Sequence, residues 1–398
     1  MWWFVNTYRY TPDPTAASEA VLHAGGAGVI YFYQDEKATV DGHLCVLPCS
    51  SISATDAQRV LSYISSTSNP VVNISPVETT LATSKVPVVA TFSGRGPGAD
   101  PNVVKPDIVA PGVDILAAYS PVLPVEPGDK LDPRRTSHVI FSGTSMACPH
   151  IAGIVALLKS HHPDWSPAAI LSAIVTTGYK DGMVGNPFDF GGGHVNPNAA
   201  LHPGLVYDLL PEEYVRIRCD EFELYGTPGC GNYSDVPLNV NYPSIARLDL
   251  ANKTTITRNV TNVEEEESVY RVTVISPPGY SIQVEPQVLR FDRKGETKTF
   301  QVTMEATSEA GDDLFEEAFG SITWSDGLHE VTSPVALVRF ANIPLDYDRE
   351  PSPPARANPT NSSSTCPPTA AISSSSNAYT SSLSLYVFST VLLWLIAA

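Results

Sequence analysis

The hydrophobic positions in the first 78 residues follow two kinds of pattern. Two segments space their apolar side chains as an amphipathic helix does, and two are short continuous apolar runs typical of buried strands. The expected elements are a helix at 17–23, a strand at 28–33, a helix at 55–65 and a strand at 71–74. Gly25 and Gly26 are the stop signal of the first helix. This order predicts a small α/β unit over residues 17–78, after an irregular start at residues 1–16.

Residues 79–205 follow a different pattern, with two expected strands before two helices. The strands are expected at 86–92 and 107–110. The first helix runs from Ser145 to Lys159, and its apolar or small side chains lie on almost every face, which predicts burial nearly all round. The second helix has Ser166 as N-cap and Pro167 at its first helical position, a strong start signal, and continues to Thr177.

The next part of the chain is expected to be all-β. After a loop-rich connection at 206–238, residues 239–345 alternate apolar and polar side chains with a period of two, as at 270–275 and 299–304. Turns rich in Pro, Gly and Asp separate these runs, and the length suits a β-sandwich. Four successive glutamates at 264–267 indicate a solvated loop.

Composition narrows the classes of function. The 398 residues are 43% hydrophobic, which is enough for real cores. Lys and Arg number 24 against 42 Asp and Glu, giving a net charge of −18, which argues against binding to nucleic acid or to an anionic membrane surface. The acidic charge and five N-glycosylation sequons favour the secretory route. These sequons begin at Asn73, Asn232, Asn252, Asn259 and Asn361.

The two ends of the chain carry different targeting signals. The first residues lack the basic segment and apolar core of a signal peptide. Residues 346–384 are a Pro/Ser-rich linker, and the hydrophobic tail 385–398 is shorter than the ~20 residues of a spanning helix. Small residues at 374–377, a polar spacer and this tail fit a GPI-attachment signal, with a tail anchor or an uncleaved tail as alternatives. A GPI signal acts only on a chain that enters the endoplasmic reticulum, so we expect a missing N-terminal part.

Six cysteines are too few for a disulfide scaffold and have no paired metal-binding spacing. Cys219 and Cys230 flank a turn-like stretch, and Cys45 and Cys49 would pair if a hairpin brings them together. For each pair a disulfide and free thiols both stay open. No acidic loop has calcium-binding spacing, and we predict no cofactor and no metal.

Ser145 is the candidate nucleophile. It lies at the start of the helix 145–159, where backbone N–H groups are unpaired and the helix dipole is positive. Both features stabilise an oxyanion that forms at an attacked carbonyl. By itself this position is weak evidence, because serine is a common N-cap residue.

The longer string Phe141-Ser-Gly-Thr-Ser-Met-Ala-Cys-Pro-His150 resembles the catalytic-serine motif of subtilisin-like serine proteases, in particular their plant-type branch. The segment 17–78 resembles the inserted protease-associated domain of that branch. Further motifs occur in the family's order, the last two resembling its fibronectin type III-like domain: Phe92-Ser-Gly-Arg-Gly-Pro97, Lys105-Pro-Asp-Ile-Val-Ala-Pro-Gly112, Phe190-Gly-Gly-Gly-His-Val-Asn-Pro197, Asn241-Tyr-Pro-Ser244 and Arg258-Asn-Val-Thr-Asn-Val263.

The resemblance implies an α/β subtilisin-like catalytic domain with a partial parallel sheet over 79–205. An inserted α/β protease-associated domain over 17–78 and a C-terminal all-β fibronectin type III-like sandwich over 239–345 complete the expected fold. It also implies a serine endopeptidase that cleaves extracellular proteins or peptides. Ser145 would attack the peptide carbonyl, a histidine would take its proton, an aspartate would orient that histidine, and an asparagine would complete the oxyanion hole.

In the family those three partners precede the inserted domain, and no Asp-Thr-Gly or Gly-His-Gly-Thr string occurs in this chain. Only Ser145 therefore carries over, and the chain alone is expected to be inactive. His150 lies more than one helical turn past Ser145, and we interpret it as a packing residue. The expected location is extracellular, in the cell wall or GPI-anchored at the outer face of the plasma membrane.

The alternative is a non-catalytic interaction protein built from the protease-associated and fibronectin-like domains. Such a protein would expose the apolar edge and face of half a parallel sheet, which is unfavourable.

Overall fold

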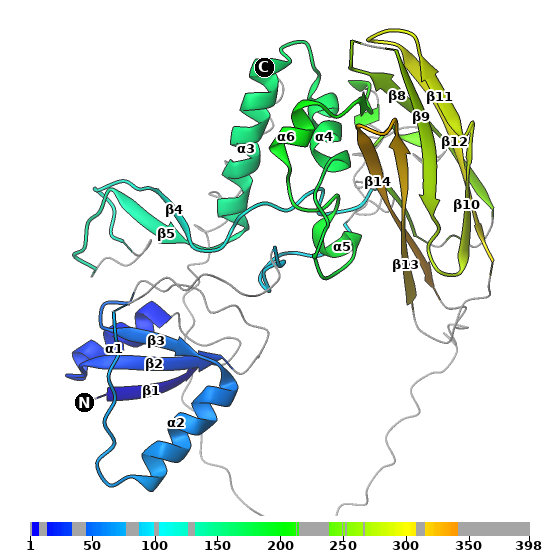
Figure 1. The fold of residues 1–398 in the computed structure, drawn as a ribbon. Helices are drawn as coiled ribbons and strands as arrows, with labels where there is room; N and C mark the ends of the chain where they lie inside the picture. Colours follow the sequence, from blue (N-terminus) through cyan, green and yellow to red (C-terminus); the bar gives the residue numbers. More distant parts are fainter. Residues whose placement is uncertain are drawn as a thin grey trace, which may run out of the picture.

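The computed structural model describes residues 2–7, 14–33, 45–76, 87–98, 103–125, 132–211, 213–214, 239–248, 250, 253–265, 267–307 and 315–340. Along the chain these residues form an α/β unit, a β-hairpin with four helices, and a two-sheet β-structure (Figure 1). Cys219 and Cys230, the linker at 346–384 and the hydrophobic tail at 385–398 lie outside the described residues. None of the helices in the described ranges is long and apolar enough to cross a membrane.

The N-terminal unit is a three-stranded parallel sheet with two helices. Its elements are β1 (Trp2–Thr7), α1 (Pro14–His23), β2 (Gly28–Tyr33), β3 (Cys49–Ile52) and α2 (Ala54–Ser66), with strand order β1-β2-β3. The predicted helices at 17–23 and 55–65 and the predicted strand at 28–33 are confirmed. Local signals set the helix ends. The Ser53 hydroxyl accepts a hydrogen bond from the Asp56 N–H at 3.1 Å, and Gly25 follows α1 with φ of 74°.

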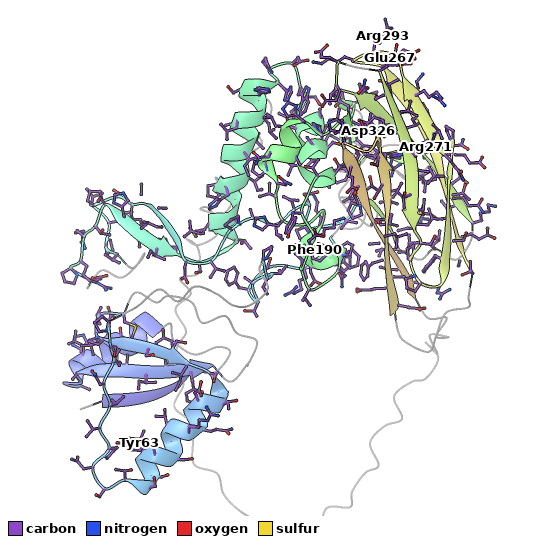
Figure 2. All side chains as sticks on the ribbon, in the orientation of Figure 1. Tyr63, Phe190, Glu267, Arg271, Arg293 and Asp326 are labelled. Carbon is purple, nitrogen blue, oxygen red and sulfur yellow. A yellow bond between two sulfur atoms is a disulfide. The ribbon has the colours of Figure 1, made fainter. Side chains whose placement is uncertain are left out.

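Two expectations for this unit are wrong. Residues 1–16 are not wholly irregular, because β1 pairs with the whole of β2, from Trp2 opposite Gly28 onward. Strand β2 is therefore hydrogen-bonded along both edges, to β1 on one side and to β3 on the other. Residues 71–74 form no strand. Instead the Tyr63 hydroxyl on α2 accepts from the Val71 N–H at 3.0 Å and donates to its carbonyl at 3.2 Å (Tyr63 in Figure 2).

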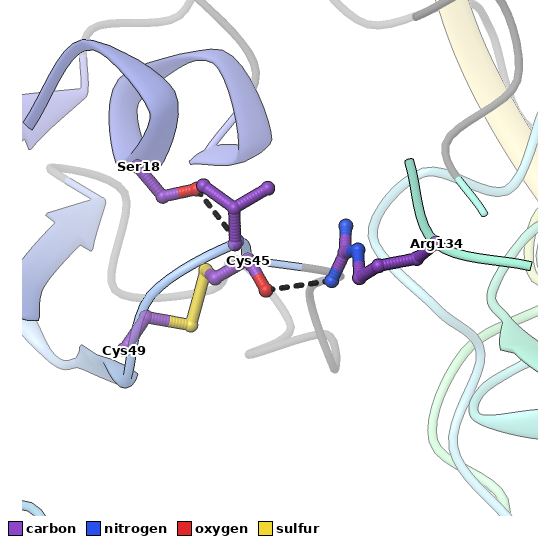
Figure 3. The surroundings of a disulfide bond; sticks show 5 residues. Ser18, Cys45, Cys49 and Arg134 are labelled. Carbon is purple, nitrogen blue, oxygen red and sulfur yellow. Dashed lines mark hydrogen bonds between the residues drawn. A yellow bond between two sulfur atoms is a disulfide. The ribbon is translucent and has the colours of Figure 1, made fainter. Parts of the chain in front are cut away.

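A disulfide links Cys45 and Cys49 just before and at the start of β3, as one of the two alternatives for this pair predicts. The Cys45 carbonyl accepts a hydrogen bond from the Arg134 guanidinium at 2.9 Å (Figure 3). The neighbouring Val46 N–H donates to the Ser18 hydroxyl on α1 at 3.0 Å. These contacts tie the disulfide loop to α1 and to residues 132–137, which directly precede the strand β5 (His138–Phe141).

The middle of the chain is mainly helical. Its elements are β4 (Ile115–Ala118), β5 (His138–Phe141), α3 (Thr144–His161), α4 (Pro167–Thr176), α5 (Pro187–Phe190) and α6 (Pro197–Leu201), with β4 and β5 antiparallel. Both predicted helices are confirmed. The Ser166 hydroxyl accepts from the Ala169 N–H at 3.0 Å and so caps α4 as predicted. Helix α4 is the centre of this part, because almost all of its side chains are buried.

Four expectations for residues 79–205 are wrong: the strands at 86–92 and 107–110, the partial parallel sheet, and the burial of the first helix nearly all round. The described residues contain no parallel sheet there, because 87–90 has no strand partner and 107–110 makes only a single bridge, between Val109 and His194. An extended segment becomes a strand only when a neighbour completes its ladder. Helix α3 is also not buried nearly all round. Leu158 is buried against α4 and α6, whereas Leu157 on the other side is 67% exposed.

The C-terminal part is the predicted β-sandwich. One sheet has the order β10-β12-β8-β6 and consists of β6 (Leu205–Val206), β8 (Thr254–Asn262), β10 (Tyr280–Glu285) and β12 (Thr297–Ala306). The other has the order β11-β9-β13-β14-β7 and consists of β7 (Ile245–Leu248), β9 (Ser268–Ile275), β11 (Val288–Phe291), β13 (Phe315–Ser325) and β14 (Glu330–Phe340). Side chains from both sheets form one core, in which Trp324, Tyr270 and Phe300 are fully buried. Strand β6 lies before residue 239, where the sandwich was expected to begin, so the sandwich includes a strand that directly follows the helical part.

A polar cluster lies at the turn between β13 and β14, where Figure 2 labels Asp326. Burial raises the pKa of the Asp326 carboxyl, but hydrogen bonds from the His329 ring and from the backbone N–H groups of His329 and Leu328 outweigh it, and the net pKa lies below its usual value. Burial, together with the nearby Asp326 charge, raises the pKa of Tyr270. This turn therefore depends on an ionised Asp326.

The sandwich packs on the helical part through an apolar contact. The Phe188 ring on α5 meets the Phe319 ring on β13 edge-on, with centroids 5.2 Å apart. Val104 and Phe188 are buried with three residues of the sandwich: Ala246, Ala336 and Val338. In addition, the Val104 N–H donates to the buried Ser244 hydroxyl at 3.1 Å. The segment that begins at Val104 is thus fixed against the sandwich.

Candidate active site

Ser145 lies in the first turn of α3 and its side chain is exposed. Gly143 is the N-cap residue with φ of 156°, a conformation that other residues rarely adopt. The N–H groups of this first turn have no carbonyl one turn earlier in the helix. The Met146 N–H donates to the Gly143 carbonyl at 3.0 Å. A carbonyl group at Ser145 would therefore meet the N–H groups that precede Met146 and the positive end of the helix dipole.

The loop before Ser145 is anchored to the segment that ends at Asp114. The Gly143 N–H donates to the Gly112 carbonyl at 2.7 Å. The Ser142 hydroxyl accepts from the Asp114 N–H at 2.9 Å and donates to the Asp114 carboxylate at 3.4 Å. Two glycines and a serine–aspartate pair thus fix the direction in which the chain enters α3.

Close packing explains why Gly112 lacks a side chain. A Cβ atom there would lie 2.9 Å from the Gly143 carbonyl oxygen and 3.3 Å from the Ala147 Cβ. Any larger residue would therefore push against the loop that carries Ser145. By contrast, a Cβ at Gly153, further along α3, would meet nothing within 4 Å.

The segment 105–112 connects this loop to the sandwich. At its start, the Lys105 ammonium donates to the Asp107 carboxylate at 2.6 Å and to the Tyr242 hydroxyl at 3.0 Å. The Tyr242 hydroxyl in turn donates to Asp107 at 2.5 Å. Farther along, the Val109 N–H donates to the Gly193 carbonyl at 3.0 Å. Tyr242, which lies 97 positions after Ser145 in sequence, therefore helps to hold the segment against which the loop before Ser145 rests.

A cavity of about 650 Å³ lies beside the N-terminal end of α3. Its wall is mainly apolar and includes Val88, Ile108 and Ile151. Gly143 and Thr144, the two residues before Ser145, also line it. Ser145 thus follows directly on two residues that line a mainly apolar cavity.

No histidine of the described residues is hydrogen-bonded to Ser145. His150 bonds the Met146 carbonyl at 2.8 Å, His162 bonds the Leu201 carbonyl at 2.8 Å, and His194 bonds the Val195 carbonyl at 3.1 Å. Within the described part of the chain, the Ser145 hydroxyl makes no hydrogen bond. His43 lies outside the described residues. Among the residues that the structure describes, no base therefore contacts the serine that the sequence singled out.

The Phe-Ser-Gly-Arg-Gly-Pro motif is held against α5. Arg95 in this motif pairs with Asp189 on α5, and the Gly96 N–H donates to the Phe188 carbonyl at 2.9 Å.

No cluster of His, Cys, Asp or Glu among the described residues is arranged to hold a metal ion. Sequence reasoning had not assigned roles to Gly112, Asp114 or Tyr242, although each lies in or beside a recognised motif.

Comparison with known proteins decides the family. A model described as the subtilase family matches residues 50–193, and one described as the fibronectin type-III domain matches residues 239–337. Arabidopsis thaliana "Subtilisin-like protease SBT5.3" is 38% identical over 343 residues, which are 80% of this chain and 44% of that protein. "Subtilisin-like protease SBT1.7" from the same plant is 40% identical over 348 residues, 80% of this chain and 45% of that protein.

The chain belongs to the subtilase family. This subtilase spans about half the length of the curated relatives it matches. The subtilase match includes Ser145 and the loop from Gly112, and the fibronectin match covers the sandwich from β7 to the middle of β14. Two of the predictions are thereby confirmed: the subtilase family and the C-terminal fibronectin-like domain.

Proposed function

We propose that this subtilase contributes the nucleophile of a serine endopeptidase, that Ser145 is this nucleophile, and that proteins or peptides are the substrates. The observation that carries the proposal is the exposed Ser145 on the first turn of α3, inside the segment that matches the subtilase family. The start of α3 and the anchored loop before it suit the binding of a peptide carbonyl at Ser145. The adjacent apolar cavity suits a peptide with an apolar side chain next to the cleaved bond.

In the proposed reaction the Ser145 Oγ forms a bond to the peptide carbonyl carbon while a histidine base takes its proton. The negative charge on the carbonyl oxygen is stabilised by N–H groups at the start of α3. Collapse of this intermediate breaks the C–N bond, and the amine leaves with the proton from the base. Water then hydrolyses the acyl-serine by the same steps and regenerates Ser145.

The histidine, its aspartate and the second oxyanion donor are not among the residues that contact Ser145 in the described structure. We therefore propose that the 398-residue chain alone hydrolyses peptides poorly or not at all. In subtilisin itself, loss of the histidine lowers turnover by about a millionfold.

We also propose that the protein follows the secretory route, that residues 17–78 are part of a protease-associated domain, and that the tail 385–398 directs GPI attachment. The Cys45–Cys49 disulfide supports an oxidising compartment. The parallel sheet and helices of the N-terminal unit support a separate α/β unit.

Release of the protein from cells by phosphatidylinositol-specific phospholipase C tests the proposed GPI anchor. Retention at the cell surface after that treatment would contradict it.

Hydrolysis of a fluorogenic protein substrate by the protein as its source organism makes it tests the catalytic proposal. Ser145→Ala is expected to abolish hydrolysis. Ser160→Ala, at the exposed far end of the same helix, is the matched control and is expected to keep full activity. Equal activity of the wild type and Ser145→Ala would overturn the assignment of the nucleophile.

A further inference from the structure

The outer face of the sandwich carries an uncharged polar patch on β8 and β12. Side chains alternate along β8, so that Ile256, Arg258 and Val260 are buried. The patch consists of the intervening residues and their partners across the sheet: Thr255, Thr257, Asn259 and Thr261 on β8, and Thr297, Thr299, Gln301 and Thr303 on β12. In a chain with a net charge of −18, these eight positions contain no ionisable group.

Asn259 lies within this patch and is exposed. Its backbone N–H donates to the Asn241 side-chain oxygen at 2.8 Å, and its carbonyl accepts from the Asn241 amide at 2.9 Å. Its side-chain oxygen accepts from the Thr299 hydroxyl at 2.7 Å. The remaining polar group, the Nδ2 amide, has no hydrogen-bond partner in the described part of the chain.

Asn259 begins the acceptor sequence Asn-Val-Thr, which ends at Thr261. We propose that Asn259 carries an N-linked glycan that covers the β8–β12 patch. The proposal rests on entry into the secretory route, which is part of the proposed function. In the reaction, Nδ2 forms a bond to the anomeric carbon of a lipid-diphosphate-linked oligosaccharide, the bond from that carbon to the diphosphate oxygen breaks, and Nδ2 loses one proton.

The folded structure accommodates a glycan at this atom without losing a hydrogen bond. Attachment at Nδ2 leaves the side-chain oxygen available to the Thr299 hydroxyl and leaves both backbone bonds to Asn241 intact. Because Arg258 and Val260 point into the sandwich, the Asn259 side chain points away from it. A flexible hydrophilic chain there meets hydroxyl and amide groups and no charge.

Asn73 is the internal comparison. It is the other sequon asparagine in the described residues, and it is also exposed, but it lies in a segment without regular structure and its sequon ends in serine. The other three sequon asparagines, Asn232, Asn252 and Asn361, lie outside the described residues.

The test is a peptide map of the full chain, produced in a eukaryotic secretory host behind a cleavable signal peptide. Glycans are removed enzymatically in heavy-oxygen water, which converts each glycosylated asparagine to labelled aspartate. Trypsin then releases the peptide 259–271, because Arg258 precedes it and Arg271 ends it. We expect the label at Asn259. Asn262 in the same peptide lies outside any sequon and controls for spontaneous deamidation.

Variants separate the acceptor from its surroundings. Asn259→Gln and Thr261→Ala are each expected to remove one glycan, seen as a single step in gel mobility. Thr261→Ser keeps the sequon and is expected to keep the glycan. Thr299→Ala removes the hydrogen bond to the side-chain oxygen but not the acceptor atom, and is also expected to keep it.

An unlabelled Asn259 in protein whose Asn73 is labelled would overturn the proposal. If the chain is retained inside the host, the retained fraction is mapped in the same way, since glycosylation precedes folding. The readout needs no proteolytic activity, and Ser145→Ala is expected to carry the same glycan. Failure of the catalytic proposal therefore leaves this result unaffected.

Discussion

Removal of the Tyr242 hydroxyl should loosen the segment that supports the nucleophile loop. Tyr242→Phe deletes two hydrogen bonds, one from Lys105 at 3.0 Å and one to Asp107 at 2.5 Å. A hydrogen bond to a charged group contributes about 1.5–3 kcal/mol. Lys105 and Asp107 are 44% and 24% exposed and stay paired with each other, so water replaces much of what they lose. We therefore expect the change to cost about 1.5 kcal/mol in total.

Amide hydrogen exchange of the chain measures this loss locally. A loss of about 1.4 kcal/mol corresponds to a tenfold change in an opening equilibrium, so exchange should accelerate about tenfold. The acceleration should be confined to 103–112 and 241–244, where the Val104 N–H donates to the Ser244 hydroxyl. Tyr179→Phe is the control, since its hydroxyl makes no hydrogen bond in the described residues and its side chain is 45% exposed. Unchanged exchange in both segments, or equal acceleration in α1 and β2, would show that the Tyr242 hydroxyl does not hold this segment.

Three further predictions follow from other contacts. In the protein as its source organism makes it, Gly112→Ala should slow the labelling of Ser145 by a fluorophosphonate at least tenfold, because the new Cβ would press on the loop before Ser145. Gly153→Ala is the control and should be labelled at the wild-type rate, since its Cβ meets nothing within 4 Å. Equal labelling rates of the two variants would contradict this. Asp326→Asn should destabilise the sandwich at neutral pH. Burial raises the pKa of the Asp326 carboxyl, but the hydrogen bonds in its turn outweigh burial and lower the net pKa. The ionised carboxylate therefore stabilises the folded sandwich fully above the unfolded pKa of 3.8, and this stabilisation is lost as the pH falls through the lower folded pKa. The difference from wild type in urea unfolding should therefore shrink in acid, and a constant difference would refute it. Replacing Cys45 and Cys49 by serine opens a short loop and should cost the N-terminal unit about 2 kcal/mol, seen as faster exchange in β2 and β3.

Local signals in the sequence predicted those parts of the fold that depend on a few neighbouring residues. Ser166 and Pro167 start α4 because capping and a fixed φ act within one turn. The period of two in residues 239–345 predicted the sandwich, since each strand has one face in the shared core. Ser145 was predicted at the start of its helix because the signals that start a helix lie within one turn of the sequence.

Features that depend on distant partners could not be predicted in this way. Residues 87–90 have the composition of a strand, but a strand needs a neighbour, and the described residues offer none. The burial of α3 depends on what packs against each face, which its small apolar side chains do not specify. The role of Tyr242 depends on a contact with Asp107, 135 positions earlier in the chain.

Covalent labelling distinguishes a nucleophilic Ser145 from an ordinary exposed serine. The protein isolated from its source is treated with a fluorophosphonate, digested with trypsin, and searched for the adduct on the peptide 136–159, which contains Ser145. The account predicts one adduct, placed by fragment ions on Ser145, and its loss after prior heat denaturation of the enzyme. A protein that cleaves substrate while Ser145 stays unlabelled, or that carries the adduct on another serine, would contradict the account.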